Sequence, residues 1–429
     1  MPIIKQHRVA VIHPDLGVGG AERLIVDASK ALKECGHQVT IYTGYHDRMR
    51  CFDETRDGTL NTVTLGQWIP RTIFGRFHAL MAYLKMIYIA FYLLFFSNYD
   101  LVLCDQVSAC IPFLRLNLWA NPKIIFYCHF PDQLLTKRES LMKAAYRKPL
   151  DLFEEWSTSL ADSILVNSKF TRNVVQQTFK SLRNRELIVL YPCVDLDHFI
   201  KNKPSDDDCE TIFKDYDSVP REKFIYLSLN RFERKKALAT AIESLSVCLF
   251  KLKHEQDKLQ LNEKGNKKEG MHLIVAGGYD SRLKDSVDYY AELKQLTQDL
   301  DLVPNVTFIE SPSDGDKLKL LQICNAVVYT PENEHFGIVP LEAMAMSRPV
   351  IASASGGPLE TIEDGVNGFL CSHDNDDSFP NAMLELYADQ VKSDAMGSRG
   401  FIRVKKDFSY QAFRDHLNRV CFPPGTHAS

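Results

Sequence analysis

The sequence lacks an excess of charge of either sign. Its 51 lysines and arginines nearly balance 55 aspartates and glutamates, which gives a formal net charge of -4. Without a basic surplus there is no overall field to attract nucleic acid, so we expect no nucleic-acid partner. Paired cysteines are also missing, because the 11 cysteines include no Cys-x-x-Cys and lie scattered in apolar runs. An odd set of unpaired thiols is typical of a reducing compartment.

Other absences narrow the chemistry. Residues 1–10 carry Lys5, His7 and Arg8 where a signal peptide has an apolar run, so secretion is not expected. No cluster of His, Asp or Cys has the spacing of metal ligands, which favours a metal-independent protein without a cofactor. A nicotinamide cofactor is not expected either, because Glu22 stands where the dinucleotide fingerprint requires a third glycine.

The chain does contain a repeated alternation of strands and helices. A length of 429 residues, 45% of them apolar, exceeds what one hydrophobic core usually supports, so two domains are expected. In both halves short apolar runs alternate with longer helical patterns, which predicts an α/β fold with two parallel, Rossmann-like sheets. The predicted strands are 9–13, 38–43, 101–104, 124–128, 163–166 and 187–190 in the first half, and 224–229, 272–276, 306–309, 326–329 and 350–352 in the second.

Composition also predicts the domain boundaries. We expect a first domain over 1–200, a polar and acidic linker over 201–221, and a second domain over 222–408. A C-terminal helical segment, 409–429, is expected to pack back onto the first domain. The Lys- and Glu-rich stretch 251–270 predicts a solvated helix end followed by a loop.

Residues 79–97 form the most apolar segment of the chain. We expect a membrane-associating helix that lies in the membrane face, with Tyr83, Lys85, Tyr88 and Tyr92 at the level of the lipid headgroups. A buried helix of the first domain is the alternative, because the strand–helix rhythm continues past it. A true span is the least favoured, since it would put neighbouring strands on opposite sides of the membrane.

Gly17, Gly19 and Gly20 follow the first predicted strand and open the first predicted helix. Glycine lets backbone amides come close to a phosphate, and the positive end of a helix dipole favours an anion. These residues are therefore candidates for binding a phosphate. A tight turn without a ligand is the alternative.

A run of cations, 231–236, follows the first strand of the predicted second domain. In open parallel sheets, ligands bind at the carboxyl ends of the strands. Arg231 and Lys236 can clamp a diphosphate there, the arginine as a fork and the lysine as a point charge. For Arg234 and Lys235 we expect a solvated surface.

Two glutamates are spaced so that they can divide the binding of a nucleotide sugar. Glu334 ends a loop and can reach a donor sugar, while Glu342, in the following helix, can accept hydrogen bonds from both ribose hydroxyls. Gly337 lets the start of that helix approach the ligand. His129 follows a strand of the first domain and is expected to face the cleft. Solvated glutamates and a satisfied structural histidine are the alternatives.

These motifs resemble a known family. Gly17-Val18-Gly19-Gly20, Arg231 with Lys236, and Glu334-x7-Glu342 followed by Gly356-Gly357 are similar to the retaining family-4 glycosyltransferases. That family has the GT-B fold, in which two Rossmann-like domains face each other across a cleft. Within it, finer matches resemble the eukaryotic alpha-1,3/1,6-mannosyltransferases of lipid-linked oligosaccharide synthesis; they lie at 13–17, 128–132, 275–280 and 333–337.

The resemblance implies a substrate pair and a location. The donor would be GDP-mannose, and the acceptor Man1GlcNAc2 on dolichyl diphosphate, to which one enzyme adds an alpha-1,3 and an alpha-1,6 mannose for protein N-glycosylation. The expected location is the cytosolic face of the endoplasmic reticulum membrane. Expected partners are the two substrates, the membrane surface and other mannosyltransferases of the pathway.

The resemblance also implies residue roles. Glu334, His129, Arg231 and Lys236 are expected to be catalytic. Ala237 departs from the family, which often has glycine after the lysine, so Lys235 and Lys236 both stay candidates for the phosphate ligand. The expected donor-binding residues are Gly17, Gly19, Gly20, Arg231, Lys235, Lys236, Glu334, Phe336, Gly337, Ile338 and Glu342.

Two other functions stay open at this point. One is a GT-B glycosyltransferase with another nucleotide sugar or acceptor, and the other is a catalytically silent scaffold of the same fold. A scaffold is disfavoured because Arg231, Lys236, Glu334 and Glu342 are all present. Since the residues offer no acid–nucleophile pair of the glycosidase kind, we expect same-face attack assisted by the leaving phosphate.

Overall fold

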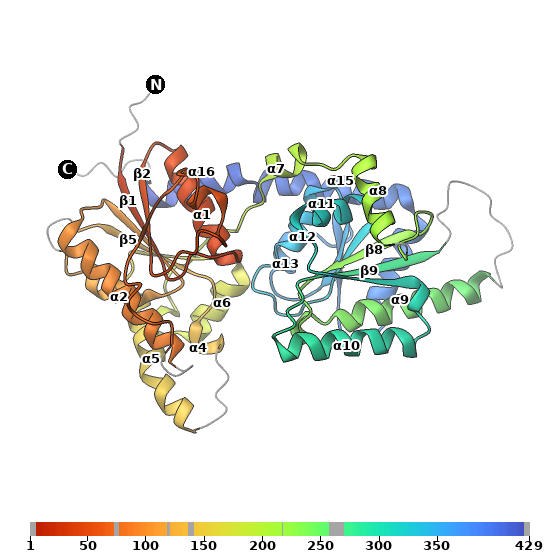
Figure 1. Cartoon of the computed structure of the whole chain (residues 1–429), viewed down its shortest axis with the longest axis horizontal. Helices are drawn as coiled ribbons and strands as arrows, with labels where there is room; N and C mark the ends of the chain where they lie inside the picture. Colours follow the sequence, from red (N-terminus) through yellow and green to blue (C-terminus); the bar gives the residue numbers. More distant parts are fainter. Residues whose placement is uncertain are drawn as a thin grey trace. The chain divides into compact units, whose positions relative to one another are not determined.

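The structure, a computed structural model, describes residues 6–72, 77–117, 121–135, 141–216, 218–256 and 270–423. These residues fold into two compact units (Figure 1). Unit 1 combines residues 1–193 with the C-terminal segment 410–429, and unit 2 contains residues 194–409. The expected α/β class with two parallel, Rossmann-like sheets is confirmed.

Unit 1 is built on a seven-stranded parallel sheet. Its strand order, β3-β2-β1-β4-β5-β6-β7, reverses direction between β1 and β4. In open α/β sheets the carboxyl ends of the strands at such a reversal form the usual ligand site. The strands are β1 (Arg8–His13), β2 (Gln38–Thr43), β3 (Asn61–Thr64), β4 (Leu101–Asp105), β5 (Lys123–Cys128), β6 (Ser163–Val166) and β7 (Ile188–Val189).

Helices cover both faces of this sheet. Alternate residues of β1 pack against α2 (His78–Phe96) on one face and against α1 (Gly20–Glu34) on the other. The C-terminal helix α16 (Tyr410–Cys421) lies against α1, where Phe413 and Leu417 are buried, so it belongs to unit 1. The other helices of unit 1 are α3 (Ile111–Leu114), α4 (Asp132–Leu135), α5 (Leu141–Ser159) and α6 (Lys169–Thr178).

Unit 2 is built on a six-stranded parallel sheet. Its order, β10-β9-β8-β11-β12-β13, reverses between β8 and β11. This second reversal marks a second ligand-site edge. The strands are β8 (Phe224–Leu229), β9 (Met271–Gly277), β10 (Val306–Glu310), β11 (Ala326–Tyr329), β12 (Val350–Ser353) and β13 (Gly368–Cys371).

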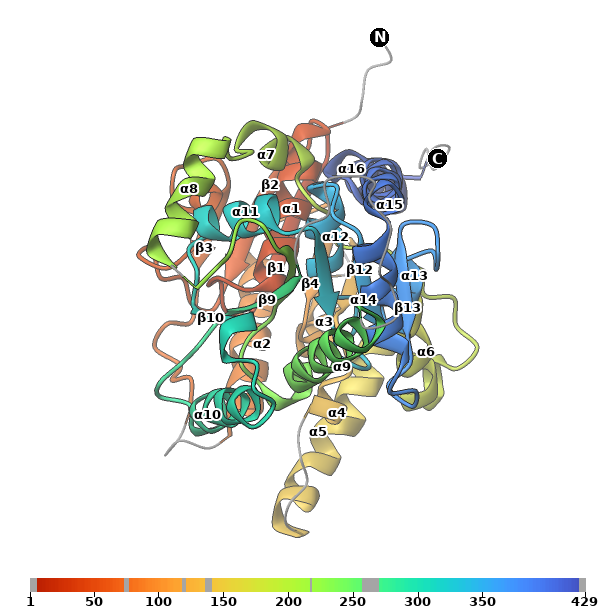
Figure 2. The same cartoon turned by 90° about the vertical axis from the view of Figure 1, so that its right-hand side faces the viewer.

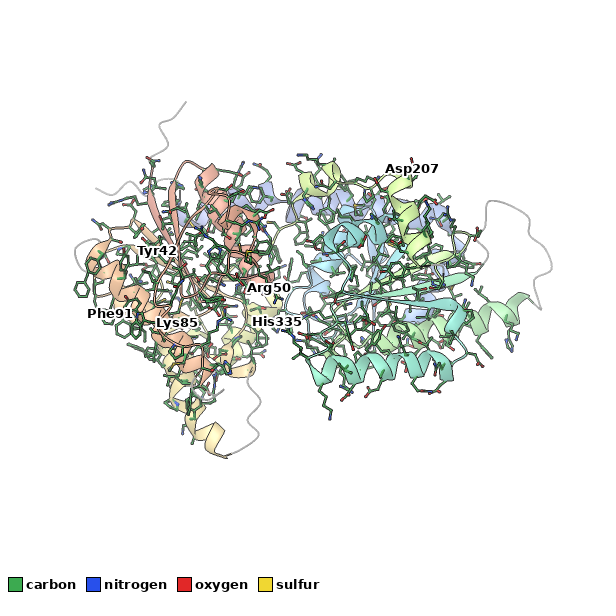
Figure 3. The ribbon with its side chains drawn as sticks, viewed as in Figure 1. Tyr42, Arg50, Lys85, Phe91, Asp207 and His335 are labelled. Carbon is green, nitrogen blue, oxygen red and sulfur yellow. The ribbon has the colours of Figure 1, made fainter. Side chains whose placement is uncertain are left out.

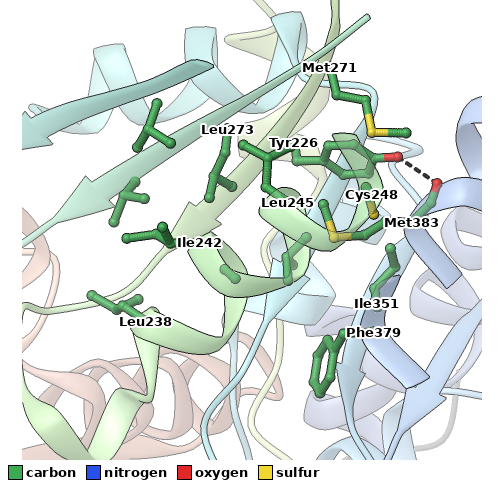
Figure 4. Close-up of a cluster of buried hydrophobic side chains, with 14 of the residues drawn as sticks. Tyr226, Leu238, Ile242, Leu245, Cys248, Met271, Leu273, Ile351, Phe379 and Met383 are labelled. Atoms are coloured by element: carbon green, nitrogen blue, oxygen red, sulfur yellow. Dashed lines mark hydrogen bonds between the residues drawn. The ribbon is translucent and has the colours of Figure 1, made fainter. Parts of the chain in front are cut away.

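One face of the second sheet packs beneath α9 (Leu238–Gln256), α10 (Lys284–Asp299) and α14 (Ser378–Ala388). Helices α9 and α14 lie side by side there (Figure 2). The buried Tyr226 hydroxyl donates to the Met383 carbonyl at 2.6 Å, which satisfies the polar atom in this apolar cluster (Figure 4). The other α-helices of unit 2 are α7 (Leu196–Lys201), α8 (Asp206–Asp215), α11 (Asp314–Ile323), α12 (Val339–Ala345), α13 (Pro358–Thr361) and α15 (Gln390–Arg403).

The apolar segment expected at 79–97 is helix α2. Among the described residues it alone is long and apolar enough to cross a membrane. One side of it is buried in unit 1, and the other exposes large side chains. The exposed ones are Leu84, Tyr88, Phe91, Phe95 and Phe96, between 37% and 74% accessible.

The headgroup positions expected for Tyr83 and Lys85 are wrong. The two side chains are only 6% and 5% exposed, because they lie on the side of α2 that packs into unit 1. The Lys85 stem fills the space beside Gly44, where a Cβ would lie 2.9 Å from Lys85 Cδ. Figure 3 labels Lys85 together with the exposed Phe91 of the same helix.

The acidic stretch expected to be a linker contains helix α8. Ser205 accepts the Asp208 amide at 3.2 Å, and the Asp208 carboxylate accepts the Ser205 amide at 3.0 Å, which is a capping box. The negative charges of the three aspartates in the first turn also stabilise the helix, because they interact favourably with the positive end of its dipole. Helix α8 packs on α11, so unit 2 begins at Val194. Of the stretch 251–270, α9 reaches Gln256, and residues 257–269 lie outside the described part.

Candidate active site

Three adjacent strands of unit 1 end in ionisable side chains. His13 is the last residue of β1, Asp105 is the last residue of β4, and His129 follows β5. Because β1, β4 and β5 are parallel neighbours, these side chains meet at the carboxyl edge of the sheet. Asp105 accepts hydrogen bonds from His13 Nδ1 and from His129 Nε2, both at 2.8 Å. The predicted site residue His129 thus belongs to a network of three side chains.

Burial and charge act in opposite directions within this network. Burial alone would raise the pKa of the Asp105 carboxyl, but the attraction that His129 and His13 exert when protonated, together with their hydrogen bonds, outweighs it and holds that pKa below its ordinary value. For His13, burial acts to lower the pKa, but the attraction of Asp105 and Glu22 outweighs it and raises the pKa to about 9. At neutral pH His13 is therefore an imidazolium beside the Asp105 carboxylate.

The three candidate glycines lie in the turn from β1 to α1. Glu22 folds back over Gly19, where a Cβ would lie 2.4 Å from Glu22 Oε2. A side chain at position 19 would therefore displace Glu22, whose Oε1 is 4.0 Å from His13 Nε2. A Cβ at Gly17 or Gly20 would meet no atom within 4 Å. Gly19 thus has a packing role, and the space around Gly17 and Gly20 suits the close approach of a ligand.

In unit 2 the cation run 231–236 follows β8. Lys236 is 8% exposed, and its ammonium forms an ion pair with Glu334. The side chains of Arg231 and Lys235 are 64% and 67% exposed, and they contact Glu233 at 2.7 and 3.0 Å. The structure therefore brings Lys236, and not Lys235, together with Glu334.

The second glutamate of the motif has a cation of its own. Glu342 lies in α12, and its Oε1 accepts a hydrogen bond from Lys317 Nζ at 2.6 Å. Its Oε2 is buried and receives no hydrogen bond from any described residue. A buried acceptor without a donor is costly unless a ligand supplies one. Glu342 therefore has one open oxygen rather than two.

Glycines shape the loop between β11 and α12. Gly337 has a φ of 77°, and a Cβ there would lie 2.9 Å from the Tyr329 hydroxyl oxygen. Gly357, after β12, comes so close to this loop that a Cβ would lie 2.0 Å from the Phe336 carbonyl oxygen. Only glycine fits the approach of two backbones at position 357, where the Gly357 amide also donates to the Glu334 carbonyl at 2.8 Å and so holds that residue in place.

The other predicted residues of this loop differ in exposure. Phe336 is 5% exposed, with its ring 6.1 Å from that of Phe408, and Ile338 is 37% exposed at the start of α12. Beneath them, burial and the neighbouring Glu334 raise the pKa of Tyr329 well above its usual value, so this phenol stays a neutral donor. In the described part of the chain, no group of three or more His, Cys, Asp or Glu is arranged to hold a metal ion.

Comparison with known proteins identifies the family of the chain. Residues 18–198 match the family described as Glycosyltransferase Family 4, and residues 210–403 match Glycosyl transferases group 1. The human alpha-1,3/1,6-mannosyltransferase ALG2 is 47% identical over 416 residues, which cover 96% of this chain and 94% of that protein. The chain belongs to the alpha-1,3/1,6-mannosyltransferase family. The expected family and its enzyme class, glycosyltransferase, are confirmed.

Further relatives of this mannosyltransferase agree. The Dictyostelium discoideum ALG2 is 42% identical over 97% of this chain and 98% of its own. Among solved structures, sucrose-phosphate synthase from Thermosynechococcus elongatus has a TM-score of 0.72 at 20% identity, covering 97% of this chain and 98% of that one. A glycosyltransferase from Rickettsia africae matches with a TM-score of 0.72 at 19% identity over the same shares. These likenesses show the GT-B fold.

Asp105 and Lys317, which contact predicted site residues in the two clusters, were not predicted from the sequence. Asp105 directly follows the apolar run 101–104 and so stands at a strand end, which was the available signal. Lys317 lies 25 residues before its partner Glu342, on a different helix, and no local pattern marks it. Each of the two residues forms a hydrogen bond with a predicted site residue and so belongs to one of the two clusters.

Proposed function

We propose that this mannosyltransferase takes mannose from GDP-mannose and adds it, with retention of configuration, to Man1GlcNAc2-diphosphodolichol, forming first one and then the other of its two linkages. The observation that carries the proposal is similarity over nearly the whole chain, at 37–47% identity, to proteins named alpha-1,3/1,6-mannosyltransferase. That name joins two linkages in one enzyme, which implies two successive additions.

The cations of unit 2 support a nucleoside diphosphate as the leaving group. As the bond between the anomeric carbon and the phosphate oxygen breaks, negative charge grows on the diphosphate. Lys236 is held in place by Glu334, and Arg231 offers an exposed guanidinium, so both can stabilise that charge. The acceptor hydroxyl attacks the same face of the sugar, and its proton passes to the leaving phosphate.

The remaining roles follow from the contacts of each group. Glu342 Oε2, buried and without a donor, accepts a hydrogen bond from a ribose hydroxyl. Glu334 and His129 contact the transferred mannose. The open space around Gly17 and Gly20 admits the phosphate side of the donor, while Phe336, Gly337 and Ile338 shape the loop around it. The site is proposed to need no metal ion.

The exposed face of α2 supports a location at the membrane surface. A polyprenyl-linked acceptor stays in the bilayer, so the enzyme must work beside it. Phe95 and Phe96 are 70% and 74% exposed at one end of α2, and Trp68, 74% exposed, packs edge-to-face on Tyr88. Apolar and aromatic side chains of this kind enter the headgroup region of a bilayer. We assign this face to the cytosolic surface of the endoplasmic reticulum.

A reconstituted transfer assay tests the proposed function. The purified chain, GDP-mannose and a synthetic mannosyl-chitobiosyl-diphosphate lipid are combined in EDTA, and the products are weighed by mass spectrometry. Two successive mannose additions are expected. Glu334→Ala should lower kcat by about 100-fold or more, because Lys236 loses its partner and the sugar a contact. Glu332→Ala, an exposed glutamate of the same loop, is the matched control and should retain activity.

The outcomes separate the alternatives. Donor binding without transfer would overturn the proposed acceptor and favour another glycan lipid. Failure to bind GDP-mannose while another nucleotide sugar binds would overturn the donor, and failure to bind any would favour a silent scaffold. Activity that appears only after a divalent cation is added would contradict the metal-free site.

A further inference from the structure

The side chain of Asp105 is a fully buried charge at the carboxyl edge of the sheet in unit 1. It is fully inaccessible to solvent, yet both of its oxygens are engaged, Oδ1 by His129 and Oδ2 by His13, each at 2.8 Å. An isolated carboxylate in such a place would be costly and would take up a proton. Its ionisation is therefore retained only because cationic and hydrogen-bonding partners surround it.

His13 supplies the compensating charge. It is also fully buried, and its Nδ1 donates to Asp105, so it cannot itself reach a ligand. Its other nitrogen, Nε2, is 4.0 Å from Glu22 and makes no hydrogen bond with a described residue. His13 also attracts Asp15 electrostatically, and Arg71 lies 3.2 Å from Asp15. A protonated His13 thus has three carboxylates around it and serves as a fixed internal cation.

His129 differs from His13 because it is partly exposed. Its side chain is 20% accessible, its ring lies 4.8 Å from that of Tyr127, and its Nε2 points to Asp105. With His13 already donating to the carboxylate, the bond from His129 needs only the neutral imidazole. Which ring nitrogen of a histidine carries the proton is set by the hydrogen bond that the other end makes. The proton of a neutral His129 is therefore on Nε2, and Nδ1 carries a lone pair.

We propose that Asp105 is a positioning residue for His129: the buried Asp105–His13 pair fixes the orientation and tautomer of the His129 ring so that Nδ1 accepts a hydrogen bond from a hydroxyl of the transferred sugar. The inference rests on the proposed contact between His129 and the mannose. With its tautomer fixed in this way, His129 can only accept a hydrogen bond from the sugar at Nδ1. A neutral imidazole without this contact would populate both tautomers and could present either an acceptor or a donor there. Asp105 acts through His129 and does not touch the substrate.

The test exchanges the carboxylate for an amide. In Asp105→Asn, the amide nitrogen donates to His129 Nε2 and moves the ring proton to Nδ1, so the ring presents a donor where the sugar needs an acceptor. We expect kcat to fall by about 100-fold, the size of loss that follows when one preorganised hydrogen-bonding partner of the reacting group is removed, with the KM for GDP-mannose changed less than about threefold. In the His129→Ala background the same exchange should have no further effect on kcat. Asp100→Asn, at the opposite end of β4, is the matched control and should leave kcat unchanged.

Nitrogen-15 NMR of histidine-labelled protein provides a readout independent of activity. The signal that disappears in His129→Ala should show the Nε2-protonated tautomer in the parent protein and the Nδ1-protonated one in Asp105→Asn.

If Asp105→Asn does not fold, His13→Gln, whose amide still donates to Asp105, should retain the Nε2 tautomer and lower kcat less than His129→Ala does. An unchanged tautomer, or rate losses that add in the double variant, would overturn the proposal. The expected tautomer change in a chain that transfers no mannose would instead support the positioning role and refute the proposed function.

Discussion

The two oxygens of Glu342 have different surroundings. One accepts a hydrogen bond from Lys317, and the other is buried without a donor from the described residues. Lys317 therefore fixes the carboxylate so that its open oxygen faces one direction, and it also offsets the cost of holding a charge that is largely buried. If Glu342 binds the ribose as proposed, Lys317 sets the affinity for the nucleotide without touching it.

Replacing Lys317 tests this arrangement. Lys317→Met should raise the Kd for GDP roughly tenfold, because Glu342 loses a charge-assisted hydrogen bond and its fixed position. Titration calorimetry with GDP measures the change without any acceptor lipid. Lys319→Met is the matched control, since Lys319 lies on the same helix and contacts Thr211 and Asp316 instead. Equal losses in both variants would mean that α11 is perturbed as a whole.

Ala237 shows how a departure from the family pattern is absorbed. The residue has left-handed backbone angles, φ 47° and ψ 42°, directly after the short helix Arg234–Lys236. Glycine adopts this conformation without strain, whereas alanine pays about 1–2 kcal/mol. The left-handed backbone at this position thus explains why the family often has glycine there, and the alanine in this chain adopts the same turn. Lys236 is the buried lysine of the pair, and its choice over Lys235 as the phosphate ligand stays a prediction.

Helix α2 is both a buried helix of unit 1 and a helix with an exposed apolar face, two properties that were alternatives in the prediction from sequence. Its inner side is buried in unit 1, and its outer side exposes aromatic and aliphatic residues. Composition could predict an apolar helix but not which residues face the core, because nearly every position is apolar. That is why Lys85 and Tyr83 were assigned to the wrong side.

The exposed end of α2 can be tested by vesicle binding. Phe95→Ser with Phe96→Ser should weaken partitioning onto phosphatidylcholine vesicles with anionic lipid by at least roughly tenfold, because two apolar rings no longer enter the interface. The thermal stability should change little, since both rings are largely exposed already. Phe250→Ser, at 62% exposure in unit 2, is the control. Unchanged partitioning in the double variant would contradict the assigned face.

The sequence predicted the central strands better than the sheet edges. The strands that carry the site, such as 9–13 and 224–229, were predicted to within about a residue because buried parallel strands are continuous apolar runs. The two missed strands, β3 and β13, lie at sheet edges, and the polar Asn61–Thr64 has no buried residue. Helix α8 was missed because the acidic residues that cap it are also typical of a linker.

For the whole molecule, two buried histidines give the two units opposite pH responses. In unit 2, His272 is fully buried on β9, and burial lowers its pKa to about 4. The unfolded chain takes up this proton below about pH 6.5, so unit 2 loses stability as the pH falls from 6.5 toward 4. In unit 1, the raised pKa of His13, about 9, stabilises the fold below pH 6.5, and this contribution is lost as the pH rises through 9.

The tryptophans allow these responses to be separated, because Trp68, Trp119 and Trp156 are the only three and all fall within residues 1–193. Melting followed by tryptophan fluorescence should therefore report unit 1 and shift to lower temperature between pH 6.5 and 9. Circular dichroism follows both units and should reveal a second transition that shifts down between pH 6.5 and 4. Each shift corresponds to at most about 3.4 kcal/mol in the free energy of unfolding. His272→Gln should remove the acid-side shift alone and His13→Gln the alkaline one. A single transition that responds identically in both probes at every pH would instead mean that the two units unfold as one cooperative body.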